Sequence, residues 1–272
     1  MRTFDYLLPH CTVRLNGIIN GQVASYGTGF YYLFNDSLTD DDGNVNDGGS
    51  AQLCIVTNKH VIAGMDQVTF YFNVTNEDGS EREKEMLTLS LDSNTVIDHP
   101  EDNVDLCVIL AYEIINLLRE KNKKIHLYPV RKNIRLPENQ VEQLGTIQNL
   151  LMIGYPNAIW DHENNLPIMR TGINATPLYE NYLGEDSFAV DIATYKGSSG
   201  SPVFIYDKGA YIENGQAKFG QRIIFVGVIK QAHSRSQRHS ENITTEEMLH
   251  IGIAIKAHKL DVFEDLIRAH IE

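Results

Sequence analysis

A tight turn of glycine and serine separates two apolar runs late in the chain. The turn is Gly197-Ser198-Ser199-Gly200-Ser201-Pro202, and the apolar runs are residues 188–192 and 203–206. Glycine adopts left-handed backbone conformations without steric cost, so such a turn can point several backbone amides in one direction. Beside an exposed serine, such amides could donate hydrogen bonds to the oxyanion that forms in acyl transfer. The same residues also suit a plain Gly/Ser-rich hairpin, so the turn alone leaves both interpretations open.

A histidine and an aspartate earlier in the chain could make a serine of this turn reactive. A serine hydroxyl is a poor nucleophile without a general base, and the base needs a third group to orient it. His60 follows an apolar, β-branched run, and a strand end would hold it rigidly beside a cleft. Asp105 directly precedes another apolar run, where a buried carboxylate is costly without a partner. Asp98 and Asp102 are competing acids, but neither is followed at once by apolar residues.

The order and spacing of these residues resemble those of the trypsin-like (chymotrypsin-fold) serine peptidases. His60, Asp105 and Ser199 occur in the family's order, with gaps of 45 and 94 residues that are close to the family's. The motifs around His60 and Ser199 are most similar in sequence to those of the intracellular or stress-protease branch of this family. The resemblance covers about residues 10 to 256, and its matching segments are Gly27-Thr28-Gly29-Phe30, Thr57-Asn58-Lys59-His60-Val61, Gly154-Tyr155-Pro156, the Ser199 turn, Val226-Gly227-Val228-Ile229 and Gly252-Ile253-Ala254-Ile255.

The resemblance implies a role for each residue of the site. Ser199 would attack a carbonyl carbon, His60 would take and return the proton, and Asp105 would hold the imidazole. The backbone amides of Gly197 and Ser199 would form the oxyanion hole. No cofactor and no metal is implied. Relatives that are activated by cleavage carry an aspartate before the nucleophile, and this chain has Ser198 there, so activation by a newly cut N-terminus is not expected.

The resemblance also places the pocket that would receive the substrate side chain. Its floor would be Ala193 with Thr194 beside it, and its walls would be Lys230, Gln231, Ala232 and Gly252. Small residues and the absence of an aspartate at the floor predict an apolar side chain rather than lysine or arginine. Lys230 or Thr194 could instead favour an acidic or amide side chain. The strand over residues 230–232 is expected to pair with the substrate backbone.

The net charge limits the classes of partner that the chain can bind, and the cysteine content predicts its cellular compartment. A formal charge of −13 argues against a nucleic-acid or anionic-membrane partner. Much of the negative charge lies in residues 36–49, which are expected to form a solvated loop. In it, Asp40, Asp42 and Asn44 resemble the start of a calcium-binding loop, but no glutamate follows at the distance that would complete the ligand set, so cation binding stays an open alternative. Three cysteines, no signal-peptide-like start and no run of transmembrane length predict a cytoplasmic protein.

The strand pattern predicts an all-β fold. Short strands with turn signals at regular spacing favour two six-stranded antiparallel β-barrels, chymotrypsin-like, followed by a C-terminal helix. We expect residues 1–111 to form an N-terminal barrel carrying His60 and Asp105, and residues 146–256 a C-terminal barrel carrying Ser199. Residues 112–145 would be a crossover with a short helix, residues 233–245 a basic surface loop, and residues 257–272 the helix, with Leu260, Phe263, Leu266, Ile267 and Ile271 on its apolar face.

Two classes of function fit these observations. The first is a serine endopeptidase that acts on protein or peptide substrates through an acyl-enzyme. The alternative is a non-catalytic or latent module of peptidase fold, which binds a protein partner or is switched on by one. No segment after residue 256 has room for a peptide-binding domain, so recruitment would use the barrels themselves or another protein. Labelling with a fluorophosphonate separates the two classes.

Overall fold

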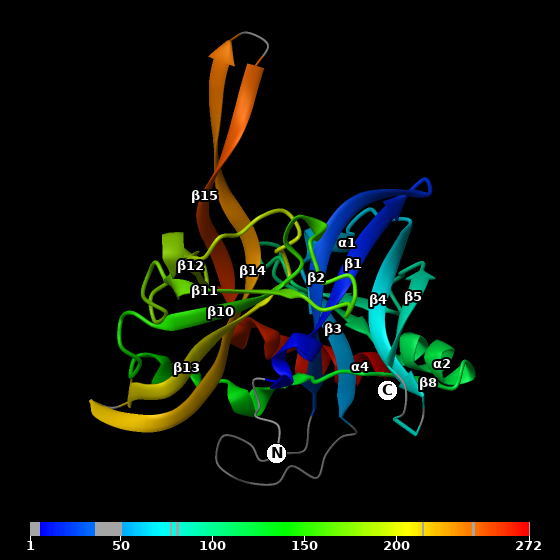
Figure 1. Cartoon of the computed structure of the whole chain (residues 1–272), viewed down its shortest axis with the longest axis horizontal. Coiled ribbons are helices and arrows are strands. Elements are labelled where there is room, and N and C mark those ends of the chain that lie inside the picture. The colour runs from blue at the N-terminus through cyan, green and yellow to red at the C-terminus, as the bar shows by residue number, and fades with distance from the viewer. Residues whose placement is uncertain are drawn as a thin grey trace.

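The computed structural model describes residues 6–35, 51–76, 78–79, 82–213, 215–240 and 243–271, which form two β-sheets and a C-terminal helix (Figure 1). Within these ranges the first sheet has nine strands, in the order β5-β4-β1-β2-β3-β7-β6, with β8 paired to β4 and β9 paired to β2. Its strands are β1 (Thr12–Ile19), β2 (Gln22–Phe34), β3 (Gln52–Thr57), β4 (Gln67–Asn76), β5 (Arg82–Leu89), β6 (Val96–Asp98), β7 (Cys107–Leu110), β8 (Lys123–Ile125) and β9 (Val130–Arg131).

The second sheet closes on itself as a six-stranded barrel in the order β10-β11-β12-β15-β14-β13. All of its pairings are antiparallel. Its strands are β10 (Asn149–Gly154), β11 (Ile168–Asn174), β12 (Ser187–Asp191), β13 (Pro202–Glu213), β14 (Gln216–Ser240) and β15 (Ile243–Lys256).

The expected all-β fold of two sheets followed by a C-terminal helix is confirmed. The second sheet is the expected closed barrel of six antiparallel strands, whereas the first is an open order of strands that includes the parallel pair β2–β9. The C-terminal half has the expected six strands, and the N-terminal half adds the short strands β6, β8 and β9 to six longer ones. β8 and β9 come from the crossover, which also holds the helices α2 (Tyr112–Glu120) and α3 (Glu138–Val141). The crossover therefore pairs with the first sheet and does more than span a gap.

A shared apolar core holds the two sheets together. The alternation of β2 places Phe30, Tyr32 and Phe34 on the side that faces the second sheet, and all three are buried. The ring of Phe30 lies 5.5 Å from that of Phe225, which lies 5.7 Å from the ring of Phe204. Because these aromatic rings pack across the two halves, the sheets are fixed relative to each other where the site forms.

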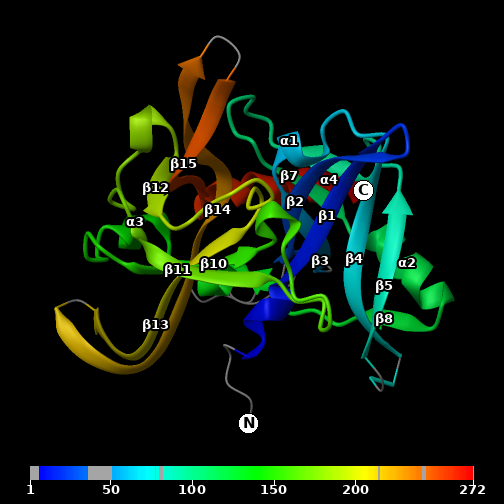
Figure 2. The same ribbon diagram turned by 45° about the horizontal axis from the view of Figure 1, so that its top comes forward.

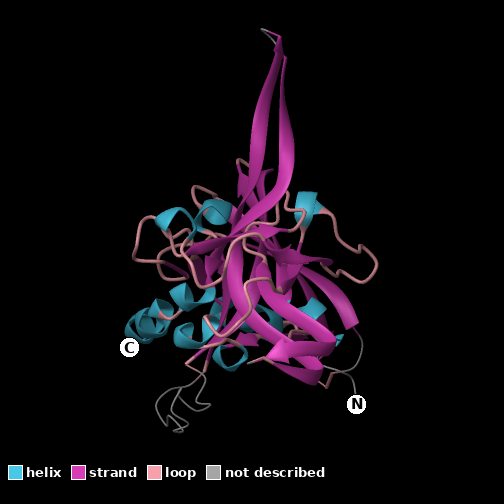
Figure 3. Cartoon of the chain, turned by 90° about the vertical axis from the view of Figure 1, so that its left-hand side faces the viewer, coloured by secondary structure: helices cyan, strands magenta, loops and turns pink. Residues whose placement is uncertain are grey.

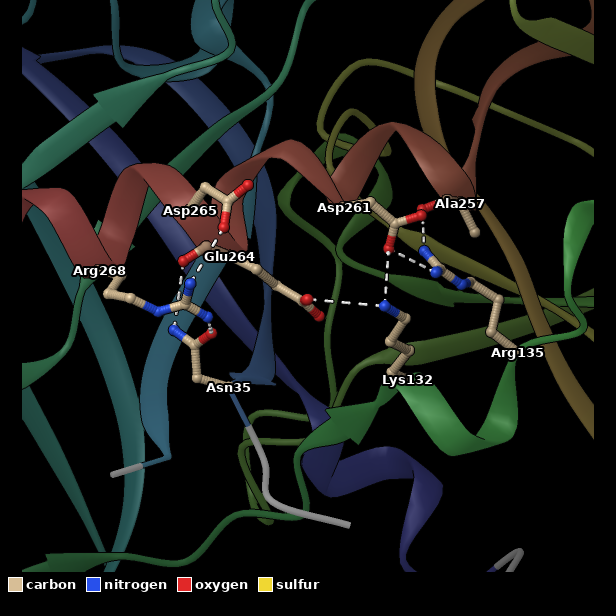
Figure 4. A network of polar contacts seen from close by, with 8 residues as sticks. All are labelled: Asn35, Lys132, Arg135, Ala257, Asp261, Glu264, Asp265 and Arg268. Atoms are coloured by element: carbon tan, nitrogen blue, oxygen red, sulfur yellow. Dashed lines mark hydrogen bonds and ion pairs between the residues drawn. The ribbon is translucent and has the colours of Figure 1, made fainter. Parts of the chain in front are cut away.

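The C-terminal helix α4 (Val262–Ile271) packs on the same core and is tied to the crossover. Phe263 and Ile267 are fully buried as their helical spacing predicts, whereas Ile271 is 53 % exposed at the last turn. Figure 4 shows the polar contacts around this helix, where the Arg135 guanidinium donates to Ala257 O at 2.8 Å and pairs with Asp261. The start of the helix is thereby held to the crossover by charge-assisted hydrogen bonds.

Two hairpin arms extend from the second barrel, and both use β14. The β14–β15 arm projects beyond the rest of the molecule, and the β13–β14 arm extends from another side (Figures 2 and 3). The expectation of a loop at residues 233–245 is wrong, because β14 continues to Ser240 and β15 starts at Ile243. The two segments pair along their length, so each satisfies backbone groups of the other.

The acidic stretch over residues 36–49 lies outside the described residues. None of the helices that the structure describes has the length and hydrophobicity that a membrane crossing would need.

Candidate active site

His60 lies on the one-turn helix α1 (Lys59–Ile62) that follows β3, rather than at the strand end itself. The fully buried Asn58 stands between the strand and this helix and donates from Nδ2 to Asp105 O at 2.6 Å. Val61, also buried, anchors the turn of helix in the core of the first sheet. The imidazole is therefore held on a rigid backbone while its ring stays accessible.

Asp105 is the acid that contacts His60. Its Oδ2 lies 2.5 Å from His60 Nδ1, and its Oδ1 accepts a hydrogen bond of 3.1 Å from the His60 backbone N–H. The Asp105 side chain is 19 % exposed and the imidazole 51 %, so the carboxylate lies on the inner side of the pair. An acceptor at Nδ1 favours the tautomer with its proton there, and Nε2 is then free to accept a proton.

The Ser199 turn is fixed to both sheets by backbone hydrogen bonds. Gly200 N–H donates to Ile229 O at 2.8 Å, and Ser199 O accepts from the Thr28 N–H of β2 at 2.9 Å. The Ser199 hydroxyl is half-buried and donates to Lys230 O at 3.2 Å. Within the described residues no hydrogen bond links this hydroxyl to His60, so the structure joins His60 to Asp105 and leaves Ser199 engaged elsewhere.

The backbone before Ser199 is turned so that two amides are free. The N–H groups of Gly197 and Ser199 have no hydrogen-bond acceptor in the described part of the chain. Lys196 O accepts from Asn157 N–H at 2.6 Å, and in a planar trans peptide this directs the Gly197 N–H the opposite way. Gly197 has φ +87°, and a Cβ there would lie 2.5 Å from Tyr155 O, so only glycine fits.

Thr28 is a residue of this region whose role the sequence did not reveal. Its hydroxyl is fully buried, donates to Gly197 O at 2.9 Å and accepts from Tyr155 N–H at 3.0 Å. Its carbonyl accepts from the Thr57 hydroxyl at 2.8 Å. The motif Gly27-Thr28-Gly29-Phe30 was a signal for this position, but the partners of the hydroxyl are more than 100 residues away in sequence.

The structure brings part of the expected substrate pocket together. Gly252 pairs with Val190 on one side and with Ala232 on the other, and a Cβ on it would lie 2.7 Å from Thr194 Cγ2. Thr194 is fully buried, and its hydroxyl has no hydrogen-bond partner among the residues that the structure describes. Of the other expected lining residues, Ala193 is half-buried, Gln231 pairs with Ile253, and Lys230 forms an ion pair of 3.2 Å with Glu185.

Two lysines lie around His99, which shortly precedes Asp105 in the chain. Lys59 Nζ donates to His99 O at 2.8 Å, and the Lys259 ammonium pairs with Glu101 at 3.0 Å. Burial lowers the pKa of His99, which favours the neutral imidazole among these cations. In the portion of the chain that is described, no group of three or more His, Cys, Asp or Glu side chains could hold a metal ion.

No curated protein matches the chain by sequence. Among solved structures, the serine endoprotease from Yersinia pestis is 17 % identical with a TM-score of 0.49, covering 98 % of this chain and 68 % of its own. The Rv3671c protease in its inactive form is 17 % identical with a TM-score of 0.42, covering 95 % of this chain and 88 % of its own.

The family model of the trypsin-like peptidase domain matches residues 27–212. The match includes His60, Asp105, the Ser199 turn and Thr28, and it extends over more than half of the chain. The chain therefore belongs to the trypsin-like peptidase family.

Proposed function

We propose that this protein is a serine endopeptidase with Ser199 as nucleophile, His60 as general base and Asp105 as the residue that orients the imidazole. The contact between His60 Nδ1 and Asp105 Oδ2, reinforced by the hydrogen bond from the His60 N–H, is the observation that carries the proposal. Such a pair fixes the orientation of the imidazole and leaves Nε2 free to accept the proton of the serine hydroxyl during attack.

The reaction begins with a rotation of the Ser199 side chain from Lys230 O toward His60 Nε2. The hydroxyl oxygen then bonds to the substrate carbonyl carbon while its proton passes to Nε2. The amides of Gly197 and Ser199 stabilise the resulting oxyanion, a contribution that is commonly about 3 kcal/mol for each donor. Collapse breaks the C–N bond as His60 protonates the leaving amine, and water releases the acyl group by the same steps.

The substrate backbone is proposed to pair with residues 230–232 of β14, and its side chain to enter beside Thr194, Ala232 and Gly252. The buried Thr194 hydroxyl lacks a partner, and an unpaired buried hydroxyl costs about 1–3 kcal/mol. An entering side chain with an amide or carboxyl group would remove this cost, whereas an apolar one would gain only burial. Cleavage of a peptide library distinguishes the two, and a strict arginine preference would contradict both.

A second candidate, a latent form of the same enzyme, is favoured by the hydrogen bond between the Ser199 hydroxyl and Lys230 O. In this form a protein partner or the substrate itself releases the hydroxyl. A pseudoenzyme that only binds a partner is the further alternative. We place the protein in the cytoplasm, because its three cysteines are all free and buried, which suits a reducing compartment; cell fractionation tests this.

A fluorophosphonate probe tests the proposal directly. The wild type is expected to be labelled on Ser199, as mass spectrometry of the modified peptide would show, and Ser199→Ala is expected to lose the label. Ser201→Ala is the matched control, because Ser201 lies in the same turn but is fully buried, with a hydroxyl that has no partner. A folded wild type that is neither labelled nor cleaves any peptide library would refute a constitutively active enzyme and favour the latent form or the binding module.

A further inference from the structure

A segment of the second barrel lies across the first sheet and reaches the turn that carries Ser199. We name residues 157–165 the strap; it follows the end of β10 and precedes β11 (Figure 2). Its contacts with β1, β4 and β5 play no part in the proposed chemical steps. They nevertheless hold the strap at one end, while its other end contacts the backbone of the oxyanion loop, residues 195–199.

The strongest contact of the strap is a guanidinium between two rings. Arg14 of β1 is only 6 % exposed, and its Cζ lies 3.6 Å from the ring centroid of Tyr71 and 3.5 Å from that of Trp160. Tyr71 belongs to β4, and Trp160 belongs to the strap. A cation–π contact is strongest when the guanidinium is desolvated, so both contacts stabilise the attachment of the strap to the first sheet. The planar guanidinium of arginine can stack against a ring on each of its faces, whereas the ammonium of lysine cannot.

Hydrogen bonds from the first sheet hold the rest of the strap. The buried Asn73 donates to Asn164 O at 3.2 Å and to Asn165 O at 3.1 Å. Lys84 Nζ donates to His162 O at 3.0 Å. These donors come from β4 and β5, so the strap is bound by strands that contribute nothing else to the proposed site.

The other end of the strap sets the orientation of one peptide of the oxyanion loop. Asn157 N–H donates to Lys196 O at 2.6 Å, and the planar peptide then turns the Gly197 N–H away from the strap. Asn157 and Ala158 have φ +50° and +54°, a left-handed conformation that costs a residue with a Cβ about 1 kcal/mol. Two consecutive residues of this kind persist only where their surroundings hold them.

The Ser198 side chain does not supply this restraint on the Lys196–Gly197 peptide. The Ser198 hydroxyl, 1 % exposed, accepts from the Tyr195 N–H at 3.2 Å and so bonds only within the loop. We propose that Arg14 and Trp160 are positioning residues, which clamp the strap to the first sheet and thereby hold the Gly197 N–H in the direction needed for an oxyanion. This inference rests on the proposed function for its catalytic consequence, but the ordering of the loop is independent of activity.

The test compares Arg14→Lys with Arg222→Lys. Arg222 is the matched control, because its guanidinium is also buried and lies 4.6 Å from the ring of Tyr211, but it belongs to the β13–β14 arm. Amide hydrogen exchange over residues 195–200 is expected to be about tenfold faster in Arg14→Lys, the change produced by losing one local hydrogen bond. It is expected to stay at the wild-type rate in Arg222→Lys.

Activity and fluorescence give further readouts. For peptide amide substrates, kcat is expected to fall about 10²-fold in Arg14→Lys with KM within threefold, as for the loss of an oxyanion donor. Trp160 is the only tryptophan, so quenching of its fluorescence by acrylamide reports whether the clamp is open. If Arg14→Lys fails to fold, Trp160→Leu takes its place, with Trp160→Phe as the conservative variant that keeps a ring on the guanidinium. These two variants contain no tryptophan, so hydrogen exchange over residues 157–165 replaces acrylamide quenching as the report on whether the clamp is open.

The outcomes separate the two proposals. Equal exchange over residues 195–200 in Arg14→Lys and Arg222→Lys, while acrylamide shows the clamp open, overturns the positioning role. Faster exchange in Arg14→Lys with a wild type that neither cleaves nor is labelled supports the clamp and refutes a constitutively active peptidase. The inference is also overturned if the wild type is active and Arg14→Lys has the same kcat while acrylamide quenching shows its clamp to be open.

Discussion

The hydroxyl of Thr28 offers a direct measurement of how strongly the two sheets are coupled at the site. Thr28→Val keeps the size and branching of the side chain but removes the hydroxyl. Thr28 is fully buried, and its hydroxyl has two partners, Gly197 O and Tyr155 N–H. The variant therefore leaves one backbone acceptor and one backbone donor unpaired, because a methyl group takes the place of the hydroxyl.

The expected cost follows from those two groups. A buried polar group left without a partner costs about 1–3 kcal/mol, so the two together should lower the free energy of unfolding by about 2–5 kcal/mol. For a chain of this size this corresponds to a fall in Tm of roughly 5–15 °C. Thr28→Ser, which keeps the hydroxyl and loses one methyl group, should cost only about 1 kcal/mol.

The measurement is thermal and urea unfolding of the three proteins, with fluorophosphonate labelling below the transition. Because Gly197 O belongs to the oxyanion loop, Thr28→Val is also expected to be labelled more slowly than wild type at a temperature where it is fully folded. A Tm of Thr28→Val equal to that of the wild type, or lower stability of Thr28→Ser than of Thr28→Val, would refute the reasoning.

Three further predictions concern the backbone, pH and the proton relay. Gly200→Ala should cost about 3 kcal/mol or more in thermal unfolding, because φ is +85° and the Cβ would lie 1.9 Å from Thr28 O; Gly21→Ala, with φ +73° and open space, should cost only about 1 kcal/mol. Burial, with His126 and Arg82 nearby, lowers the pKa of His10 from 6.5 to about 4. The unfolded state therefore binds the proton at a higher pH than the folded state, and the free energy of unfolding should fall by up to about 3 kcal/mol as the pH drops from 6.5 to 4. Urea unfolding at several pH values measures this fall, which should be smaller in His10→Gln. Asp105→Asn should lower kcat about 10³- to 10⁴-fold without loss of fold, and unchanged kinetics would exclude the role proposed for Asp105.

The features that sequence could predict are those that local chemistry dictates. A glycine with φ +87° at position 197 follows from a turn that only glycine tolerates, and the alternating strand β4 follows from its period of two. The helix α4 buries Phe263 and Ile267 as a 3.6-residue period requires. In each case the residue type itself limits the conformations available.

Other features depend on partners that are distant in sequence. The arm over residues 233–245 has no apolar face, so no period distinguishes it from a loop, and its strands exist because they pair with each other. His60 sits on a turn of helix because the buried Asn58 is held by the carbonyl of Asp105, 47 residues later. Arg14 of β1 meets Trp160 of the strap, which belongs to the other half of the chain, and nothing in either local sequence indicates this contact.

These distant contacts divide the site into two parts with different dependence on the fold. The His60–Asp105 pair is held entirely by the first sheet, through α1 and the segment before β7. The Ser199 turn belongs to the second sheet, but two of its carbonyl groups accept hydrogen bonds from Thr28 of the first sheet. The Thr28 N–H donates to Ser199 O, and the Thr28 hydroxyl donates to Gly197 O. Loosening the contact between the sheets should therefore disturb the oxyanion loop before it disturbs the imidazole, and the latent state favoured by the Ser199–Lys230 hydrogen bond would be controlled at that contact rather than at His60.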